Sequence, residues 1–270
     1  MKTSIIMAYN NRVQQLWLTL KSIRKQFCKD VEVIVVDDGS DVDQLASKVV
    51  SNFKDMEIKT TLLQKEKKTW INPCIPFNIG FREAKGDIII IQSPECIHIG
   101  DVLGYVRRSL TSKNYLTFSC YSTSRHEHSK LGVLINTPDS LLEKEVLKIV
   151  SLFKSNGSAN HASEDCWFNH PTFCPNQYHF LSAITRENLQ DLGGFDERYG
   201  TGYCWDDNEF LWRVKQKGLC VQIVAPEHGF AIHQWHEKGA LRGTCPEWYK
   251  NKAMFEEITK KSPTYHVSYL

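Results

Sequence analysis

The sequence predicts an α/β fold with a mostly parallel central sheet flanked by helices. Two runs, VEVIVV at 31–36 and DIIIIQ at 87–92, are nearly continuous in apolar β-formers, as expected of strands buried on both faces. Segments with helical periodicity separate such runs. Strands that alternate with helices indicate right-handed βαβ units, and the 270 residues favour one large domain.

The first half of the chain is expected to contain most of the sheet. The run SIIMAY at 4–9 predicts its first strand, after which the apolar period becomes that of a helix. The residues that set this period are Leu16, Leu20, Ile23 and Phe27. Further strands are expected at 31–36, 59–63 and 87–92. A short helix with Ile79, Glu83 and Ala84, closed by Gly86, precedes the last of them.

The second half is expected to be less regular. A helix over 101–110 is followed by a strand over 115–120. Residues 121–178 show the weakest pattern, with a helix near 141–153, and this length indicates an insertion or a substrate loop. The remaining elements are a strand at 180–185, a helix from Arg186 that Gly193 and Gly194 break, a helix from Asp206, a last strand at 219–224 and a helical tail after Trp235.

Composition and charge argue against several classes of protein. With 33 basic and 31 acidic residues, the chain lacks the basic excess typical of proteins that bind duplex nucleic acid. No run of about 18 apolar residues predicts a membrane span, and the N-terminus lacks the core of a signal peptide. Nine cysteines without a CxxC pair indicate reduced thiols. A cytoplasmic location, in a cell or an infected host, is expected. No oligomeric state is predicted.

Acidic residues follow two of the predicted strands. Asp37 and Asp38 come directly after the strand at 31–36, and Glu95 comes shortly after the strand at 87–92. Because ligands bind at the carboxyl ends of parallel strands, we expect both groups at the same edge of the sheet. The sequence DDGS also forms a good turn, so turn formation is an equal explanation for Asp37 and Asp38.

A third acidic cluster lies in GYCWDDNEF at 202–210. Asp206 and Glu209 fit an acidic variant of the capping box, and negative charge suits the start of a helix. A cap explains neither Asp207 nor the preceding glycines, which suggest backbone that bends or moves. A partly shielded carboxylate beside Trp205 could instead serve as a general base.

Two histidines in IHQWH offer metal ligands. His233 and His236 are three residues apart, close enough to meet on one helical turn. Such a pair is more often structural than metal-binding. With a carboxylate from another loop it would form a site of oxygen and imidazole ligands, which suits a divalent ion such as manganese. Trp205 and Trp235 offer apolar faces for a sugar, although core packing explains either at least equally well.

Three stretches, in this order, resemble those of GT-A fold glycosyltransferases of the family 2 type. They are SIIMAYNNR with VIVVDDGSD, then NIGFREAKGDIIIIQSPE, then GGFDERYGTGYCWDDNEFLWRVKQKG. The second half is similar to galactosyltransferases and N-acetylgalactosaminyltransferases. The resemblance covers most of the chain and implies a single GT-A domain over 1–270. Residues 1–120 would then bind the nucleotide sugar, and residues 121–270 would bind the acceptor and catalyse transfer.

The resemblance implies a nucleotide-sugar donor, usually a uridine one, and a glycan-type acceptor. The residues expected around the nucleotide diphosphate are Ala8, Tyr9, Asn10, Arg12, Asp37, Asp38, Ser93 and Pro94. Asp207 matches the family's general base, with Asp206 beside it to help hold the acceptor. Arg213 lies where the family keeps an arginine. Transfer would be a single displacement with inversion.

One motif departs from the family. The metal-binding Asp-x-Asp corresponds here to Ser93-Pro94-Glu95, in which only the last acidic position remains. A single carboxylate can still hold a metal when imidazoles complete the shell. Glu95 with His233 or His236 is therefore the expected site for Mn²⁺ or Mg²⁺.

Other functions fit parts of this pattern. Loss of Asp-x-Asp is compatible with a protein that binds a nucleotide sugar or a glycan without turnover. A nucleotidyltransferase would carry a glycine-rich loop after the first strand, and AYNNR contains no glycine. A glycoside hydrolase uses paired carboxylates but would not need the nucleotide edge. A glycosyltransferase accounts for all three acidic clusters.

Overall fold

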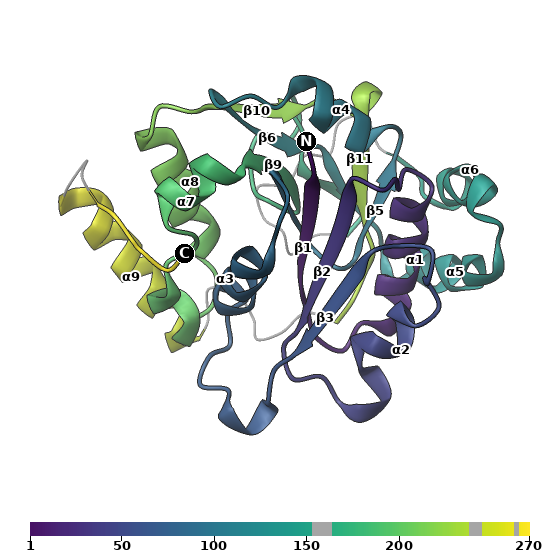
Figure 1. Ribbon diagram of the computed structural model, residues 1–270, viewed down its shortest axis with the longest axis horizontal. Coiled ribbons are helices and arrows are strands. Elements are labelled where there is room, and N and C mark those ends of the chain that lie inside the picture. Colours follow the sequence, from purple (N-terminus) through teal and green to yellow (C-terminus); the bar gives the residue numbers. More distant parts are fainter. Residues whose placement is uncertain (153–163, 238–244, 262–264) are drawn as a thin grey trace.

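In the computed structural model, residues 1–152, 164–237, 245–261 and 265–270 are described, and they form two sheets flanked by helices (Figure 1). The larger sheet has the strand order β10-β6-β9-β4-β1-β2-β3. Its strands are β1 (Thr3–Tyr9), β2 (Val31–Asp37), β3 (Ile58–Leu62), β4 (Ile88–Gln92), β6 (Asn114–Phe118), β9 (Leu181–Thr185) and β10 (Cys220–Val224). β1 pairs in parallel with β2 and β4, as the sequence predicts.

Strand β9 is an exception to the parallel arrangement. It runs antiparallel to both β4 and β6, with Leu181 opposite Gln92. The apolar pattern predicts this strand but carries no information about its direction. The reversal places the start of β9 at the edge where β1, β2 and β4 end.

Helices cover both faces of the larger sheet (Figure 1). They are α1 (Val13–Arg24), α2 (Ala46–Val50), α3 (Cys74–Glu83), α4 (Val102–Ser109), α5 (Arg125–Leu131), α6 (Asp139–Ile149), α7 (Arg186–Leu192), α8 (Asp206–Gln216) and α9 (Pro246–Lys261). Successive side chains of a strand point to opposite faces. Ile5 therefore packs in one core with Leu16 of α1, whereas Ile6 packs in the other with Phe77 of α3 and Phe210 of α8.

Helix α1 ends earlier than its apolar period predicts. Its last residue is Arg24, and the N–H groups of Gln26 and Phe27 donate to the carbonyl oxygens of Ile23 and Arg24. Such bonds between residues three apart tighten the chain and end the helix. Phe27 thus lies beyond the helix, although its side chain still packs against the core.

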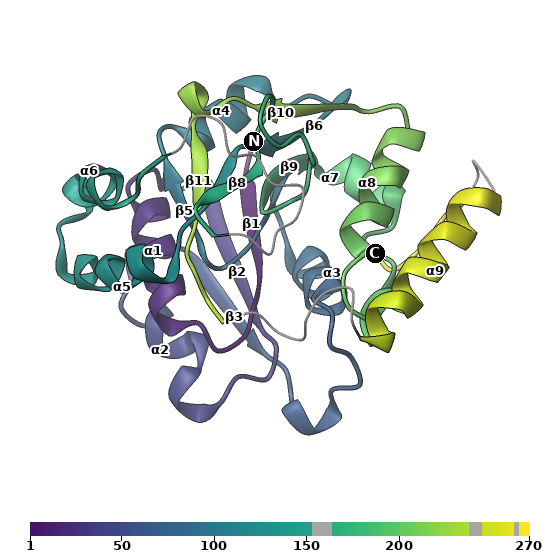
Figure 2. The same cartoon turned by 180° about the vertical axis from the view of Figure 1, so that it is seen from behind.

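A smaller sheet has the order β5-β11-β7-β8, and Figure 2 shows it from the side on which β8 and β11 face the viewer. Its strands are β5 (Cys96–Ile99), β7 (Cys120–Ser122), β8 (Cys166–Asn169) and β11 (Phe230–His233). The prediction that 219–224 is the last strand is wrong, because the run FAIH forms β11 by pairing with β5 and β7. A run this short gives too few positions for its period to be recognised.

The prediction of an irregular stretch over 121–178 is wrong for much of its length. The stretch contains most of β7 together with α5, α6 and β8, and the helix expected near 141–153 is α6. Leu142 and Trp167 pack with Ile232 in a third apolar cluster. This packing makes the region part of the folded body. Residues 153–163 of the stretch lie outside the described residues.

The tail after Trp235 contains helix α9, as predicted, and Ile258 of α9 belongs to the same apolar core as Phe210 of α8. Within the described ranges, no helix has the combination of length and apolarity needed to cross a membrane.

Candidate active site

Residues from four strands converge at one edge of the larger sheet. β1 ends at Tyr9, β2 at Asp37 and β4 at Gln92, and these strands run parallel. β9 runs the other way, so its first residue, Leu181, lies opposite Gln92. The acidic groups expected at a common edge therefore do meet there, and the residues just before β9 join them.

The first aspartate after β2 shapes the turn. Asp37 is 2% exposed, and its carboxylate accepts hydrogen bonds from the backbone N–H groups of Ser40 (3.0 Å) and Ala46 (2.8 Å). Two backbone donors in this arrangement hold the loop that follows the strand. Turn formation is thus what the structure shows for Asp37, and its contact with a nucleotide stays a prediction.

The end of β1 is similarly fixed by its own contacts. Tyr9 is fully buried, and its hydroxyl donates to the carbonyl oxygen of Gln44 (2.6 Å) and accepts from the N–H of Arg12 (3.0 Å). Ala8 is half-buried and packs against the core formed with α3 and α8. The ring of Tyr9 therefore supports the turn, and contact of these residues with a nucleotide stays a prediction.

The segment 68–72, here called the strap, connects the second aspartate after β2 with the acidic start of α8. Asp38 accepts hydrogen bonds from Lys68 Nζ (2.5 Å) and Trp70 Nε1 (2.9 Å). Burial raises the pKa of Asp38, and Lys68 acts against that shift. At the other end of the strap, Asn72 Nδ2 donates to Asp206 Oδ1 (2.7 Å). No motif in the sequence predicts this link.

Glu95 lies at the centre of a buried charge cluster. Its Oε2 accepts a hydrogen bond from Arg12 Nη1 (3.0 Å), and its Oε1 lies 3.3 Å from His233 Nε2 and 3.5 Å from His236 Nε2. Burial favours the neutral acid, but Arg12 and the two imidazoles hold the pKa of Glu95 well below its usual range. Glu95 is therefore an anion at neutral pH.

The prediction that His233 and His236 share a helical turn is wrong. His233 is the last residue of β11, and His236 follows it outside any helix. Their rings nevertheless lie 5.3 Å apart, centre to centre, because the chain after β11 passes beside Glu95. The N–H of Gln234 donates to the carbonyl oxygen of Glu95 (3.0 Å) and fixes that path.

The chemistry of the Glu95 cluster fits a divalent ion. The ligand atoms of Glu95, His233 and His236 lie within 4.8 Å of one another, and this mixture of oxygen and imidazole ligands suits manganese. His236 Nδ1 lies 2.8 Å from the carbonyl oxygen of Glu237. A proton on Nδ1 would leave Nε2 available for a metal, as is usual for metal-bound histidines. Arg12 Nη2, 3.2 Å from the same Nδ1, would require the other tautomer.

Ser93 and Pro94 form the turn between β4 and β5. The N–H of Ser93 donates to the carbonyl oxygen of Phe180 (3.0 Å), and Pro94 is buried. The ring of Phe180 in turn lies 5.6 Å from that of His233. These contacts place the segment just before β9 against the Glu95 cluster. Contact of Ser93 and Pro94 with a nucleotide stays a prediction.

The two aspartates that begin α8 differ in exposure. Asp206 is 5% exposed, whereas the side chain of Asp207 is 38% exposed. Burial, and then repulsion from Asp207, raises the pKa of Asp206 to about 7. A base must reach the hydroxyl from which it takes a proton. Asp207 meets this condition better than Asp206, whose burial and bond to Asn72 favour a supporting role.

Sequence reasoning missed His179, which contacts Asp207. His179 Nε2 lies 2.8 Å from Asp207 Oδ1, and the imidazole is 5.0 Å from the ring of Phe195 and 5.9 Å from that of Phe210. Burial lowers the pKa of His179, but the close contact with Asp207 and the charges of Asp207 and Asp206 together outweigh burial, so the pKa is raised. The sequence places His179 just before a predicted strand. A parallel strand would put this position at the opposite edge of the sheet, so only the antiparallel direction of β9 brings His179 to the site.

The capping-box interpretation of Asp206 and Glu209 is wrong. Trp205 occupies the N-cap position and makes no side-chain capping bond. Glu209 instead forms a buried ion pair with Arg213, whose Nη2 lies 2.7 Å from Glu209 Oε2 and donates to the carbonyl oxygen of Gly194 (2.9 Å). Arg213 therefore ties α8 to the turn after α7.

The backbone before α8 adopts an uncommon conformation. Cys204 and Trp205 have φ angles of 59° and 70°. Non-glycine residues adopt such angles at a cost of about 1–3 kcal/mol each. Asn251 of α9 holds this loop, because its Nδ2 donates to the carbonyl oxygens of Tyr199 (3.1 Å) and Cys204 (2.9 Å). A Cβ at Gly202 would lie 2.2 Å from Asn251 Oδ1, so glycine permits this close approach.

The two tryptophans considered as sugar platforms differ. Trp205 packs against Trp248 and Phe255, with ring centres 5.4 and 5.3 Å apart, which is core packing. Trp235 is half-buried, and its Nε1 donates to Glu164 Oε1 (2.8 Å) while the guanidinium of Arg125 lies over its ring. Trp235 therefore stays the candidate platform.

Contacts link the three acidic groups around the edge. Asn10 Nδ2 donates to the carbonyl oxygen of Asp38 (2.9 Å), and the strap joins Asp38 to the start of α8. In the other direction, the Glu95 cluster reaches the segment before β9, in which His179 contacts Asp207. The three groups are therefore connected around this edge, and their action as one site stays a prediction.

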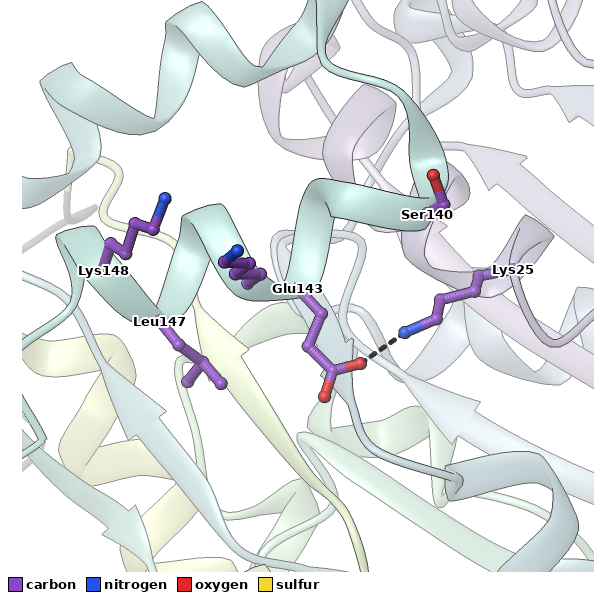
Figure 3. Close-up of a pocket in the computed structure, with 6 residues that line it drawn as sticks. Lys25, Ser140, Glu143, Leu147 and Lys148 are labelled. Atoms are coloured by element: carbon purple, nitrogen blue, oxygen red, sulfur yellow. Dashed lines mark hydrogen bonds and ion pairs between the residues drawn. The ribbon is translucent and has the colours of Figure 1, made fainter.

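A groove at the end of α1 and along α6 lies outside this site (Figure 3). Its lining residues are Lys25, Ser140, Glu143, Lys144, Leu147 and Lys148. Lys25 Nζ forms an ion pair with Glu143 Oε2 at 2.7 Å. None of the residues predicted for nucleotide, metal or acceptor lines this groove.

The chain belongs to the family described as "Glycosyltransferase like family 2", whose model matches residues 4–265. The structure is similar to TarS 1-349 of S. aureus in complex with UDP-GlcNAc, with a TM-score of 0.64 and 15% identity over 97% of this chain and 67% of that one. It is also similar to the mannosyltransferase PcManGT from Pyrobaculum calidifontis in complex with GDP-Man and Mn²⁺, with a TM-score of 0.58 and 14% identity over 97% of this chain and 65% of that one.

These similarities confirm the predicted GT-A fold and the family 2 assignment. The chain spans 60% of a further TarS 1-349 structure and 40% of the longer TarS chain. No curated protein sequence matches the chain.

Proposed function

We propose that this protein transfers a sugar from a nucleotide-diphosphate donor, in the first instance a UDP-sugar, to a hydroxyl group of a glycan-type acceptor. The observation that carries the proposal is the position of an accessible carboxylate, Asp207, at the same sheet edge as the Glu95 cluster. The family supports it, as do the UDP-GlcNAc and GDP-Man complexes of the two similar structures.

The transfer would be a single displacement. The acceptor oxygen forms a bond to the anomeric carbon while the bond from that carbon to the diphosphate breaks, and Asp207 takes the hydroxyl proton. Attack from the face opposite the leaving group inverts the configuration. Holding the hydroxyl and the donor in line supplies much of the rate.

The residues around Glu95 would manage the charge of the leaving diphosphate. Glu95, His233 and His236 are the residues that would hold Mn²⁺ or Mg²⁺, and a bound divalent ion offsets developing negative charge. Arg12, 3.0 Å from Glu95, places a further positive charge at the end of β1. Fixed charges aimed at the leaving group lower the barrier electrostatically.

The substitution Asp207→Asn tests the function. We expect it to lower transfer by about 10²–10⁴-fold, the usual contribution of a general base. Affinity for the nucleotide, measured by calorimetry, should change little because Asp207 faces the acceptor. Transfer is measured as nucleoside diphosphate released from UDP- and GDP-sugars in the presence of glycan acceptors and Mn²⁺.

Asp191→Asn is the matched control, since Asp191 is an exposed residue of α7 paired with Lys217. It should leave transfer unchanged. Comparable turnover in Asp207→Asn would remove Asp207 from the base role. A wild-type protein that binds uridine diphosphate but releases no sugar to any acceptor would instead support a nucleotide-sugar-binding protein without turnover.

A further inference from the structure

We propose that His179 is a positioning residue for Asp207: it holds one carboxylate oxygen so that the carboxylate faces the acceptor hydroxyl. The inference rests on the proposed function, in which Asp207 is the base. His179 Nε2 lies 2.8 Å from Asp207 Oδ1, an ion-pair contact that is short enough for a hydrogen bond, although the N–H is not aimed at that oxygen.

The fold gives His179 little freedom to move away. It stands two residues before Leu181, which pairs with Gln92 in the sheet, and the carbonyl oxygen of the intervening Phe180 accepts from the N–H of Ser93. The imidazole is 6% exposed. Backbone pairing and burial together fix where Nε2 points.

His179 also contacts α8 at two points one helical turn apart. Its ring packs edge-on against Phe210, and its Nε2 faces Asp207, three residues earlier on the same side of the helix. Phe195 packs against both rings, 5.0 Å from that of His179 and 4.7 Å from that of Phe210. The apolar contacts thus set the distance between imidazole and carboxylate, which is how packing holds a functional group in place.

The charged groups around His179 favour the protonated imidazole, in which Nε2 carries a proton. Asp206 and Asp207 face it from α8, and their charges act to raise its pKa against burial. On β6, the buried hydroxyl of Tyr115 donates to Ser182 Oγ (2.7 Å). An imidazole between two carboxylates donates to whichever is ionised, and Asp207 is within reach. Loss of this donor would leave the ionised form of Asp207 less favourable.

Two substitutions of His179 test the inference. His179→Phe keeps the ring volume but removes the donor, and we expect kcat to fall about 10–100-fold, as for other small displacements of a reacting group. The KM for the nucleotide sugar should hold, and the acid limb of kcat should move to higher pH. His179→Gln restores an N–H donor and should recover part of kcat. His266→Phe, at an exposed position, is the control, and melting temperatures show whether each variant folds.

Three results would overturn the role of His179. They are full kcat in His179→Phe, equal kcat in the Phe and Gln variants, or a ¹⁵N NMR spectrum of the wild-type protein in which the imidazole carries its proton on Nδ1 alone. The NMR measurement decides the matter even if a variant fails to fold. A wild-type protein without transfer activity would instead overturn the proposed function itself.

Discussion

Two neighbouring side chains of the same type have different environments at the start of α8. Asp206 and Asp207 are adjacent in the sequence, yet the first is buried against Asn72 and the second reaches solvent. The helix turns by about 100° between them, so one carboxylate faces the strap and the other is partly exposed to solvent. A raised pKa is the physical signature of the buried one.

The raised pKa of Asp206 makes stability depend on pH. Because its pKa is about 7 in the folded protein, against an ordinary value of 3.8, the folded state holds this proton more tightly than the unfolded chain. Its contribution to stability is therefore present at low pH and is lost as the pH rises towards 7. Asp206→Asn should remove this loss. The free energy of unfolding of the variant, relative to that of wild type, should therefore rise by roughly 2 kcal/mol from pH 5 to pH 8.

Urea denaturation at several pH values measures this difference. The amide oxygen of the new side chain can still accept the bond from Asn72, so packing is largely preserved. Asp43→Asn, at an exposed position of the loop after β2, is the control and should show no such trend. A constant difference between Asp206→Asn and wild type across this pH range would contradict the assignment.

Among the elements, the turn after α7 shows why the glycines of the late motif are present. Gly193 caps α7 with a φ of 73°, and the last residues of the chain lie over it. The N–H of Tyr269 donates to the carbonyl oxygen of Gly193 (3.0 Å), and Arg82 Nη1 donates to the carbonyl oxygen of Tyr269 (2.8 Å). Gly193 therefore allows the last residues of the chain to pack close to this turn. The sequence had suggested instead that the glycines let the backbone bend or move.

Gly193→Ala should destabilise the protein strongly. Its Cβ would lie 1.9 Å from the carbonyl oxygen of Val267, so the tail must shift. Gly218→Ala is a matched control, because Gly218 has a similar φ of 81° but no atom within 4 Å of a new Cβ. We expect Gly193→Ala to cost about 1–3 kcal/mol more than the control in urea denaturation, the typical cost of overpacking. Equal losses would show that the tail does not press on this turn.

At the scale of the whole molecule, the two halves of the chain are interleaved. β9, from 121–270, lies between β4 and β6, from 1–120, and β11 lies between β5 and β7 in the smaller sheet. Neither half of the chain contains all the strands of either sheet. We propose that 1–270 is a single folding unit in which donor and acceptor sides share one core.

Nucleotide binding should therefore shift one melting transition of the entire chain. Uridine diphosphate at 100 times its Kd would stabilise the folded state by about 2.7 kcal/mol. We expect a larger rise in Tm when Mn²⁺ is added, and we expect Glu95→Gln to lose that additional rise. Glu187→Gln, at an exposed position of α7, should keep it. An equal Mn²⁺-dependent shift in Glu95→Gln would place the metal elsewhere.

Much of the fold was predictable because strong local patterns encode it. The run at 87–92 and the period of Leu16 and Leu20 are decided by neighbours in sequence. The direction of β9 and the pairing of β11 depend on partners far along the chain, so no local pattern reports them. For the same reason a local motif points to Asp207, whereas no local pattern points to His179.

The conformation of Cys204 and Trp205 has a consequence for how the protein can fail. A backbone kept in an unfavourable shape relaxes when its restraint is lost, and Asn251 supplies that restraint from α9. A substitution of Asn251 would therefore impair the proposed transfer from a distance. The carboxylates of α8 would change position, although no group at the sheet edge is itself altered.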